Sequence, residues 1–283
     1  MTASFLNEEQ TALKSKVRAA FVAIEAGPPC DDATLARRVA ALDIDRYVVP
    51  SAFGGASERP SVLSLCVLRE ELAYRNAAAD SLFAVQGLGS YPTTLAGSDE
   101  QKKSLLPLVA RGEALCAFAL TEAEAGSDVA SLTTSAIRDG DTYCINGQKR
   151  FISNAGVATH YTVFARTAPG PKGISAFLVR ADTPGFWVSA QMQLMGEHPI
   201  GELEFSDCRV PVSARISDEG AGMKIALSTL DVFRSTVGAA AVGMARRALD
   251  EAIAYAKKRR QFGAPLAELS AVQMLIADSA VEL

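Results

Sequence analysis

The sequence contains few of the side chains on which metal centres and hydrolytic sites depend. Its 283 residues include two histidines, His160 and His198, and five cysteines, with no C-x-x-C pair. With so few imidazoles and no paired thiols, we expect no metal site and neither a Ser-His nor a Cys-His nucleophile pair. We expect most of the cysteines to be small buried residues. They are Cys30, Cys66, Cys116, Cys144 and Cys208.

Three other features are missing from the sequence. There is no excess of positive charge, since the formal net charge is −4, and this argues against a nucleic-acid partner. No uncharged run approaches the roughly 18–20 residues that a membrane span requires. The opening residues, MTASFLNEEQ, lack the basic and apolar regions of a signal peptide and the arginines of a transit peptide. We therefore expect a cytoplasmic protein.

What the sequence does have is apolar residues in a helical pattern. Hydrophobic residues make up 49% of the chain, enough for a large core divided over two or three subdomains. Residues 7–10 and 98–101 both match capping boxes, and apolar residues then recur three or four positions apart. We expect helices throughout 1–115, the last of them ending at Gly112.

The period changes from helical to strand-like at Cys116. Strands are predicted at 160–166, 173–180, 185–190 and 201–207, and Asn146-Gly147 predicts the turn of a hairpin. Such short, evenly spaced strands are typical of a β-sandwich or barrel.

A long helix is then predicted over 223–258, because that segment is rich in Ala, Leu and Met and lacks Pro. Gly263 and Pro265 interrupt it, and a last helix, from about Leu269, still continues at Leu283. The fold class is therefore α+β. Its parts are a helical domain at 1–115, a β domain at 116–218 and a helical domain at 219–283.

The stretch CAFALTEAEAGSD, residues 116–128, is the strongest candidate for a binding site. An apolar run leads directly into Thr121, Glu122 and a turn of small residues that includes Gly126 and Ser127. Composition leaves two interpretations open. The stretch is either an ordinary strand end, or a cradle of main-chain donors and hydroxyls for a planar, electron-poor ring or a phosphate.

Four segments together resemble the acyl-CoA dehydrogenase family. They are the 116–128 stretch with its helical lead-in at 91–113, RFISNAG at 150–156 and YAKKRRQFGAPL at 255–266. They follow one another in the order and at the spacing of that family and cover essentially the whole chain. The resemblance implies an N-terminal helical domain, a middle β-barrel or sandwich domain and a C-terminal helical bundle, incomplete here.

The resemblance also implies that FAD is the cofactor. Thr121 and main-chain N–H groups would bond the pyrimidine edge of the flavin, and Ser127 would lie beside both the flavin and the acyl-CoA. Phe151 and Ser153 stand where the family more often has Trp and Thr, and they keep an aromatic face and a hydroxyl near flavin N5. The residues implied to contact the flavin ring are Phe118, Ala119, Leu120, Thr121, Gly126, Ser127, Phe151, Ile152 and Ser153.

A second group of residues is implied to act between subunits or on the substrate. Arg259 and Phe262 match a pair that reaches the flavin of a neighbouring subunit, which implies a homodimer or homotetramer. Ser270 replaces the family's usual Gln, and Gln273, one turn later, is a substitute. Asp231 and Arg234 match positions near the acyl-CoA. Without the resemblance, they are an exposed i,i+3 ion pair, and Arg259 belongs to a solvated basic cluster.

The implied reaction is α,β-dehydrogenation of an acyl-CoA thioester, with hydride passing to flavin N5 and electrons to an electron-transfer flavoprotein. It needs a carboxylate to remove the α proton. The family's usual glutamate falls beyond Leu283, and its alternative position holds Phe233, which accepts no proton. Glu122 and Glu124 are expected to have structural or surface roles. The chain as it stands is thus expected to be inactive, being a shortened form of a longer dehydrogenase or one completed by a partner chain.

Two other functions remain open from the sequence. The same scaffold serves a flavin monooxygenase or oxidase, and rapid oxygen consumption would indicate one. A non-catalytic acyl-CoA-binding subunit would keep its affinity for the CoA ester without turnover.

Overall fold

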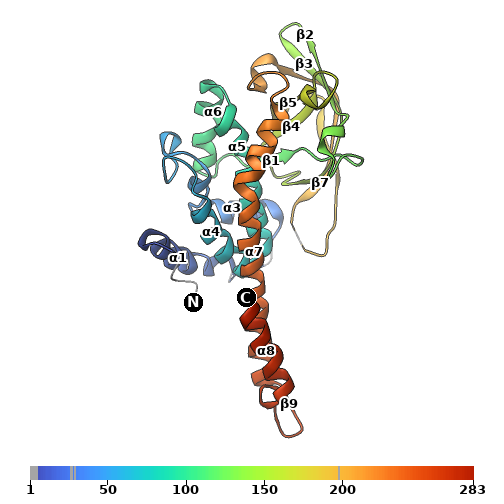
Figure 1. Cartoon of the computed structure of the whole chain (residues 1–283). Helices are drawn as coiled ribbons and strands as arrows, with labels where there is room; N and C mark the ends of the chain where they lie inside the picture. The colour runs from blue at the N-terminus through green and yellow to red at the C-terminus, as the bar shows by residue number, and fades with distance from the viewer. Residues whose placement is uncertain (1–5, 26–27, 29, 197) are drawn as a thin grey trace.

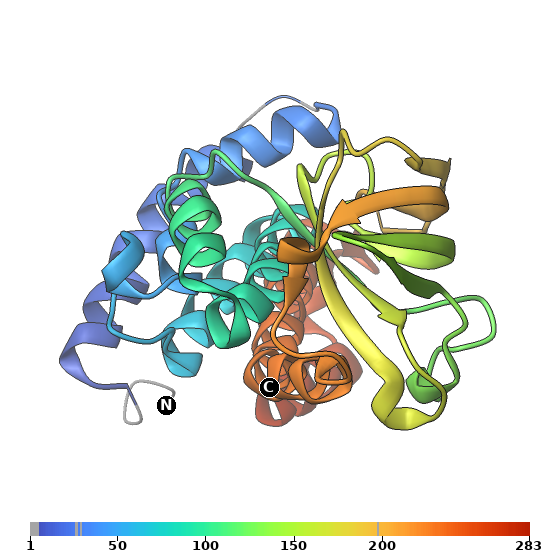
Figure 2. The ribbon, with the colours of Figure 1, turned by 90° about the horizontal axis from the view of Figure 1, so that it is seen from above.

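The computed structural model describes residues 6–25, 28, 30–196 and 198–283. A group of helices lies beside a twisted sheet, and one long helix runs along the seam between them (Figures 1 and 2). The first group comprises α1 (Glu8–Ala20), α2 (Val22–Glu25), α3 (Asp32–Ala40), α4 (Val62–Arg75), α5 (Ala77–Ala96) and α6 (Asp99–Ala110), with two short 3-10 turns, η2 (Asp45–Val48) and η3 (Ser51–Phe53).

The helix starts predicted from the sequence are confirmed. The side chains of Asn7 and Ser98 each accept a hydrogen bond from the main-chain N–H three residues on. The glutamine side chain at that position accepts one from the main-chain N–H of Asn7 or Ser98. These reciprocal bonds satisfy two of the N–H groups that every helix start leaves unpaired. The expected stop at Gly112 is also confirmed, since α6 ends at Ala110 and Gly112 has a φ of +68°.

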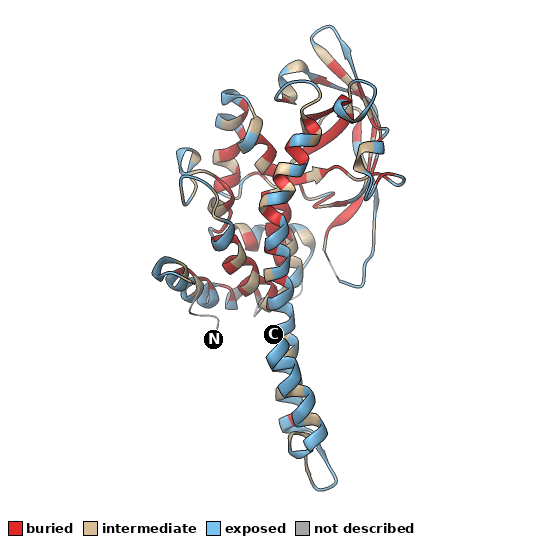
Figure 3. Cartoon of the chain, viewed as in Figure 1, coloured by how far each residue is buried: buried red, intermediate tan, exposed pale blue. Residues whose placement is uncertain are grey.

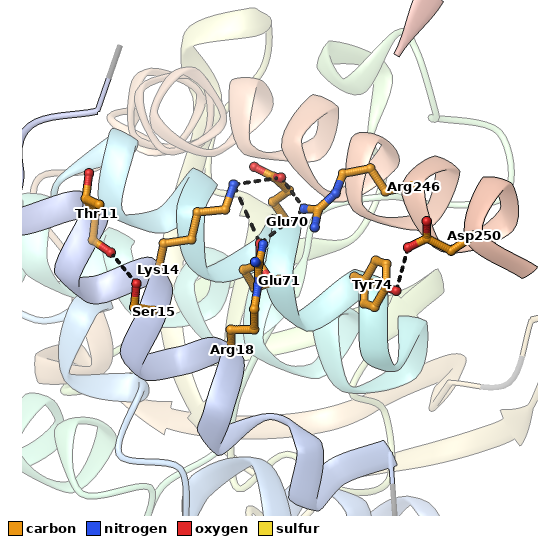
Figure 4. Close-up of polar contacts among 9 residues, drawn as sticks. All are labelled: Thr11, Lys14, Ser15, Arg18, Glu70, Glu71, Tyr74, Arg246 and Asp250. Carbon is orange, nitrogen blue, oxygen red and sulfur yellow. Dashed lines mark hydrogen bonds and ion pairs between the residues drawn. The ribbon is translucent and has the colours of Figure 1, made fainter. Parts of the chain in front are cut away.

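A cluster of charged side chains attaches α1 and the long helix to α4 (Figure 4). The buried Glu71 accepts 2.8 and 2.9 Å hydrogen bonds from Arg18. Arg246 bridges Glu71 and Glu70. The basic partners lower the pKa of Glu71, although burial alone would raise it. Because the carboxylate is buried and its partners come from two other helices, the cluster fixes how these helices pack.

The middle of the chain forms one eight-stranded sheet. Its order is β6-β7-β3-β2-β4-β5-β8, with β1 added in parallel to β4. The predicted turn at Asn146-Gly147 is wrong: both residues lie inside β3, where Gly147 takes part in a register shift, and the chain turns instead at Gly140-Asp141. The strands are β1 (Cys116–Ala119), β2 (Ser135–Asp139), β3 (Thr142–Ser153), β4 (His160–Arg166), β5 (Ile174–Arg180), β6 (Phe186–Gln191), β7 (Ile200–Pro211) and β8 (Arg215–Ile216).

The sheet folds over on itself around an aromatic core. Tyr161 of β4 and Phe186 of β6 have ring centroids 4.8 Å apart, although three strands separate β4 from β6 in the sheet. Tyr143 of β3 and Phe177 of β5 are in contact in the same way, at 5.0 Å. Contacts between strands that are not neighbours require a curled sheet with its apolar face inside, in agreement with the predicted sandwich or barrel.

The long helix α7 (Gly222–Lys258) is buried only where it crosses the rest of the molecule. Gly243 lies against α4, where a Cβ would stand 2.1 Å from the carbonyl oxygen of Glu70. By length and composition α7 could cross a membrane. A soluble helix that packs on a core passes the same test, and α7 does so through residues such as Phe233 and Ala240.

Beyond the helical group, α7 projects into solvent and ends in a small hairpin. The hairpin strands are β9 (Arg260–Gln261) and β10 (Ala264–Pro265), and α8 (Ser270–Glu282) returns along α7 (Figure 1). Figure 3 shows that this projecting part is mostly exposed. It includes apolar side chains such as Met274 and Leu275, which are 66% and 69% exposed.

The cysteines follow the expectation only in part. Cys116 and Cys208 are buried, whereas Cys66 and Cys144 are half-buried and Cys30 is exposed. An apolar neighbourhood in the sequence does not set burial: in β3, for example, Cys144 alternates with the buried Tyr143 and Ile145 and so faces the other side of the sheet.

Candidate functional site

The first two flavin-contacting segments suggested by the sequence meet in space. After β1, Thr121 runs alongside the end of β3, and its carbonyl oxygen accepts a 2.9 Å hydrogen bond from the N–H of Arg150. Residues 116–127 and 150–153 are therefore neighbours on one side of the sheet, although a loop and β2 separate them in sequence.

A buried ion pair holds these two segments together. The ammonium of Lys149 donates to Glu122 Oε1 at 2.8 Å and to the carbonyl oxygen of Leu120 at 3.1 Å. Glu122 also accepts from the N–H groups of Thr133 and Thr134. These donors lower the pKa of Glu122 to about 2 against the effect of burial, and desolvation lowers that of Lys149 to about 8. Both groups are thus charged at neutral pH.

The sequence argument missed Lys149, although a signal was present. Lys149 is an even number of positions away from Tyr143 and Ile145, both fully buried, so its side chain points to the same core face of β3. A lysine whose side chain points into the core needs a buried hydrogen-bond acceptor for its ammonium group. Glu122 supplies it, which agrees with the structural role expected for that residue. Glu124 is exposed, as a surface role requires.

A bulge in β3 turns Phe151 outward. Lys149 pairs with Leu203 and Ile152 with Gly201, so β3 has one residue more than β7 over this interval. Phe151 has a φ of +58°, rare for an aromatic residue, and is 50% exposed. A bulge that re-aims a side chain in this way is characteristic of functional sites. Ile152 is buried beneath it, and the Ser153 hydroxyl lies 3.4 Å from His198 Nε2.

The turn after β1 leaves hydroxyls available for a ligand. Glu122 and Ala125 exchange main-chain hydrogen bonds of 3.1 and 3.2 Å, which close a tight turn. Within the described part of the chain, the hydroxyls of Thr121 and Ser127 bond to no other residue, and Gly126 is exposed. Ala119 and Leu120 are buried, and the Phe118 ring packs on that of Phe164 with centroids 4.9 Å apart.

A groove of about 670 Å³ adjoins the two segments. Its walls carry four glutamates, including Glu122, and two cations, Lys149 and Arg150. Arg150 is paired with Glu202 at 3.0 Å. The free hydroxyls of Thr121 and Ser127 and the outward-facing ring of Phe151 are outside the residues that line this groove. They suit a planar, uncharged ring such as that of a flavin. The acidic walls do not suit a pyrophosphate, so that part of FAD needs other residues.

Arg259 and Phe262 are not brought to this site within one chain. Both lie at the far end of the α7–α8 projection, away from the sheet (Figure 1). Phe262 is 95% exposed and has a φ of +52°. Ser270 and Gln273 are exposed on α8, and the Gln273 amide donates to the carbonyl oxygen of Ala267 at 2.8 Å.

The three residues that the sequence analysis named on α7 differ in their exposure to solvent. Asp231 and Arg234 form a 2.8 Å ion pair with both side chains more than 60% exposed. Phe233 is buried between α7 and α5, where its ring contacts Tyr91 at 5.7 Å. A Cβ on Gly87 would stand 2.3 Å from that ring. The Phe233 ring therefore packs closely against α5. Among the described residues, no group of His, Cys, Asp and Glu could hold a metal.

Comparison with known families matches the chain along its length. The N-terminal domain of acyl-CoA dehydrogenases matches residues 7–113, the middle domain residues 117–208 and the C-terminal domain residues 220–283.

Individual relatives agree with the domain matches. A probable acyl-CoA dehydrogenase, fadE25, of Mycobacterium bovis is 44% identical over 83% of this chain, which spans only 61% of that protein's length. The protein of the same description from Mycobacterium leprae is 40% identical over 98% of this chain and 74% of its own. Butyryl-CoA dehydrogenase from Megasphaera elsdenii superposes with a TM-score of 0.91 at 32% identity, covering 98% of this chain and 76% of the other. The chain belongs to the acyl-CoA dehydrogenase family.

Proposed function

We propose that this protein binds FAD and takes part in α,β-dehydrogenation of an acyl-CoA thioester, passing electrons to an electron-transfer flavoprotein. The observation that carries the proposal is the meeting of the Thr121–Ser127 turn with the bulge at Phe151. FAD, when bound, supplies the acceptor for the hydride that leaves the β carbon.

The chain's own residues have three roles in this proposal. The hydroxyls of Thr121 and Ser127 hold the polar edge of the ring, and Phe151 covers its face. The buried pair of Lys149 and Glu122 fixes the spacing of the turn after β1 and the end of β3 from the core side. Donors that are already oriented stabilise developing negative charge without reorganisation.

Binding between subunits and substrate binding complete the proposal. Arg259 and Phe262, exposed at the tip of the projection, would contact the FAD of a second copy in a homodimer or homotetramer, with Ser270 and Gln273 nearby. Asp231 and Arg234, exposed near the start of α7, would approach the acyl-CoA. Proton removal at the α carbon is not assigned to Phe233, because phenyl accepts no proton. The base stays a prediction, a glutamate beyond Leu283.

FAD binding is tested with the purified chain. Thr121→Val and Ser127→Ala each remove one hydroxyl while keeping side-chain size, and each should weaken FAD binding about fivefold, the worth of one neutral hydrogen bond. Thr142→Val is the matched control. Thr142 lies at the other end of β3, and its hydroxyl donates only locally, to the carbonyl oxygen of Asp139 at the end of β2. Protein that stays colourless in excess FAD contradicts the proposal.

Turnover is tested with the complete gene product. Anaerobic addition of an acyl-CoA should bleach the oxidised flavin, and an electron-transfer flavoprotein should restore its colour. Rapid oxygen consumption would instead indicate an oxidase. Tight CoA-ester binding without bleaching would indicate a non-catalytic subunit.

A further inference from the structure

A second cavity lies between α3, the start of η2, α5 and the loops that lead into β1 and β4. It has a volume of about 280 Å³. Its walls are mainly apolar, with Val39, Leu82 and Val157 among them. The acyl-CoA dehydrogenation proposed above uses none of these residues.

Asp45 is the unusual member of this wall. Only 4% of it is exposed, and its Oδ1 has no hydrogen-bond partner. Burial raises the pKa of its carboxyl group to about 7, and the like charge of Asp43 adds to the effect. Buried carboxylates are normally paired or hydrogen-bonded, so an unpartnered one lining a cavity points to a missing partner.

The other polar groups around the cavity are already engaged. The Thr159 hydroxyl is bonded to Leu115 and lies 2.9 Å from His160 Nδ1. Glu113 is held by Arg111 through two 2.7 Å bonds.

Two further groups around Asp45, the Arg37 guanidinium and the Cys116 thiol, do not pair with its carboxyl group. Arg37, which also lines the cavity, donates to the Thr34 hydroxyl at 2.7 Å and forms no ion pair with Asp45. The Cys116 thiol, whose pKa is raised by burial and by Asp45, stays neutral. Among the described residues, none supplies the missing cation.

We propose that this cavity binds a small organic ammonium ion, its N–H groups on Asp45 and its short apolar body against Val39, Leu82 and Val157. An ammonium would satisfy the unpartnered oxygen and neutralise the buried charge together, which a neutral donor cannot do. The apolar walls favour a carbon chain over the bare inorganic ion.

The proposal is tested by calorimetric titration of the purified chain with n-butylammonium chloride. We expect a dissociation constant of about 1 mM, as is usual for so small a ligand. n-Butanol, which has the same size and no charge, should bind at least about tenfold more weakly. Since binding requires the ionised carboxyl group, affinity should fall about tenfold from pH 8 to pH 6, with proton release below pH 7.

Two variants test separately whether binding depends on the charge of Asp45 and on the space in the cavity. Asp45→Asn keeps the shape and should abolish both the binding and its pH dependence. Ala36→Leu fills the cavity wall with a good helix former and should abolish binding while Asp45 remains. Absence of binding to the wild type, equal binding of n-butanol, or unchanged binding to Asp45→Asn would each overturn the proposal. The titration needs neither flavin nor acyl-CoA, so its outcome is independent of the proposed function.

Discussion

The ammonium of Lys149 lies 2.8 Å from Glu122 Oε1 in the protein interior and fixes the distance between the two segments that form the candidate site. Lys149 belongs to β3, and Glu122 belongs to the turn after β1. The same ammonium bonds the carbonyl oxygen of Leu120, so one side chain connects both segments.

Removing one partner of this pair should therefore cost both stability and cofactor affinity. Lys149→Met leaves Glu122 buried without its cation, and we expect a loss of about 3 kcal/mol in the free energy of unfolding, measured by urea denaturation. Glu122→Gln should cost a similar amount. The double variant removes both charges, so it should lose less than the sum of the two single losses. Strict additivity would contradict the coupling.

Phe151→Gly should separate cofactor binding from stability. The phenyl ring is half exposed, and glycine relieves the strain of a φ of +58°, while its greater freedom in the unfolded chain offsets that gain. We expect a free energy of unfolding within about 1 kcal/mol of the wild type, together with clearly weaker FAD binding. A variant that binds FAD normally would remove the role proposed for the ring.

Two glycines of α7 make a matched pair. A Cβ on Gly243 would stand 2.1 Å from the carbonyl oxygen of Glu70, whereas one on Gly238 would meet nothing within 4 Å. Gly243→Ala should therefore lower the melting temperature, through about 1–3 kcal/mol of overpacking. Gly238→Ala should raise it, through about 1 kcal/mol of helix propensity. Equal effects would mean that α7 does not pack on α4 at Gly243.

Asp45 should make the chain less stable as the pH rises. Its folded pKa of about 7 lies above the value of an unfolded aspartate, so the folded state keeps a proton that the unfolded chain has already lost. The contribution is complete below the unfolded pKa of about 4 and is lost as the pH rises through 7, by up to about 4 kcal/mol.

The comparison with Asp45→Asn isolates this effect from other titrating groups. The difference in unfolding free energy between variant and wild type should grow in favour of the variant between about pH 4 and pH 8. A difference that does not change with pH would show that the carboxyl group titrates normally.

The sequence by itself determined the elements whose signals are local. The capping boxes at Asn7 and Ser98 depend on residues a few positions apart, and α7 follows from a local composition rich in Ala, Leu and Met without Pro, so both could be predicted from the sequence. Leu203 and Phe205 lie two positions apart in the strand predicted at 201–207, and both are buried, as the alternation of a strand requires. The family segments were visible for the same reason, because each is contiguous.

Only the tertiary structure decided how these pieces act together. Asn146-Gly147 has the composition of a turn, but pairing with β7 keeps it inside β3, because long-range strand pairing outweighs local preference. The partners Glu122 and Lys149, and the solitary Asp45, are set by burial among segments that are distant in sequence. Strand alternation could indicate that Lys149 is buried, but the partner of a buried charge depends on those distant neighbours, so no local pattern could identify it.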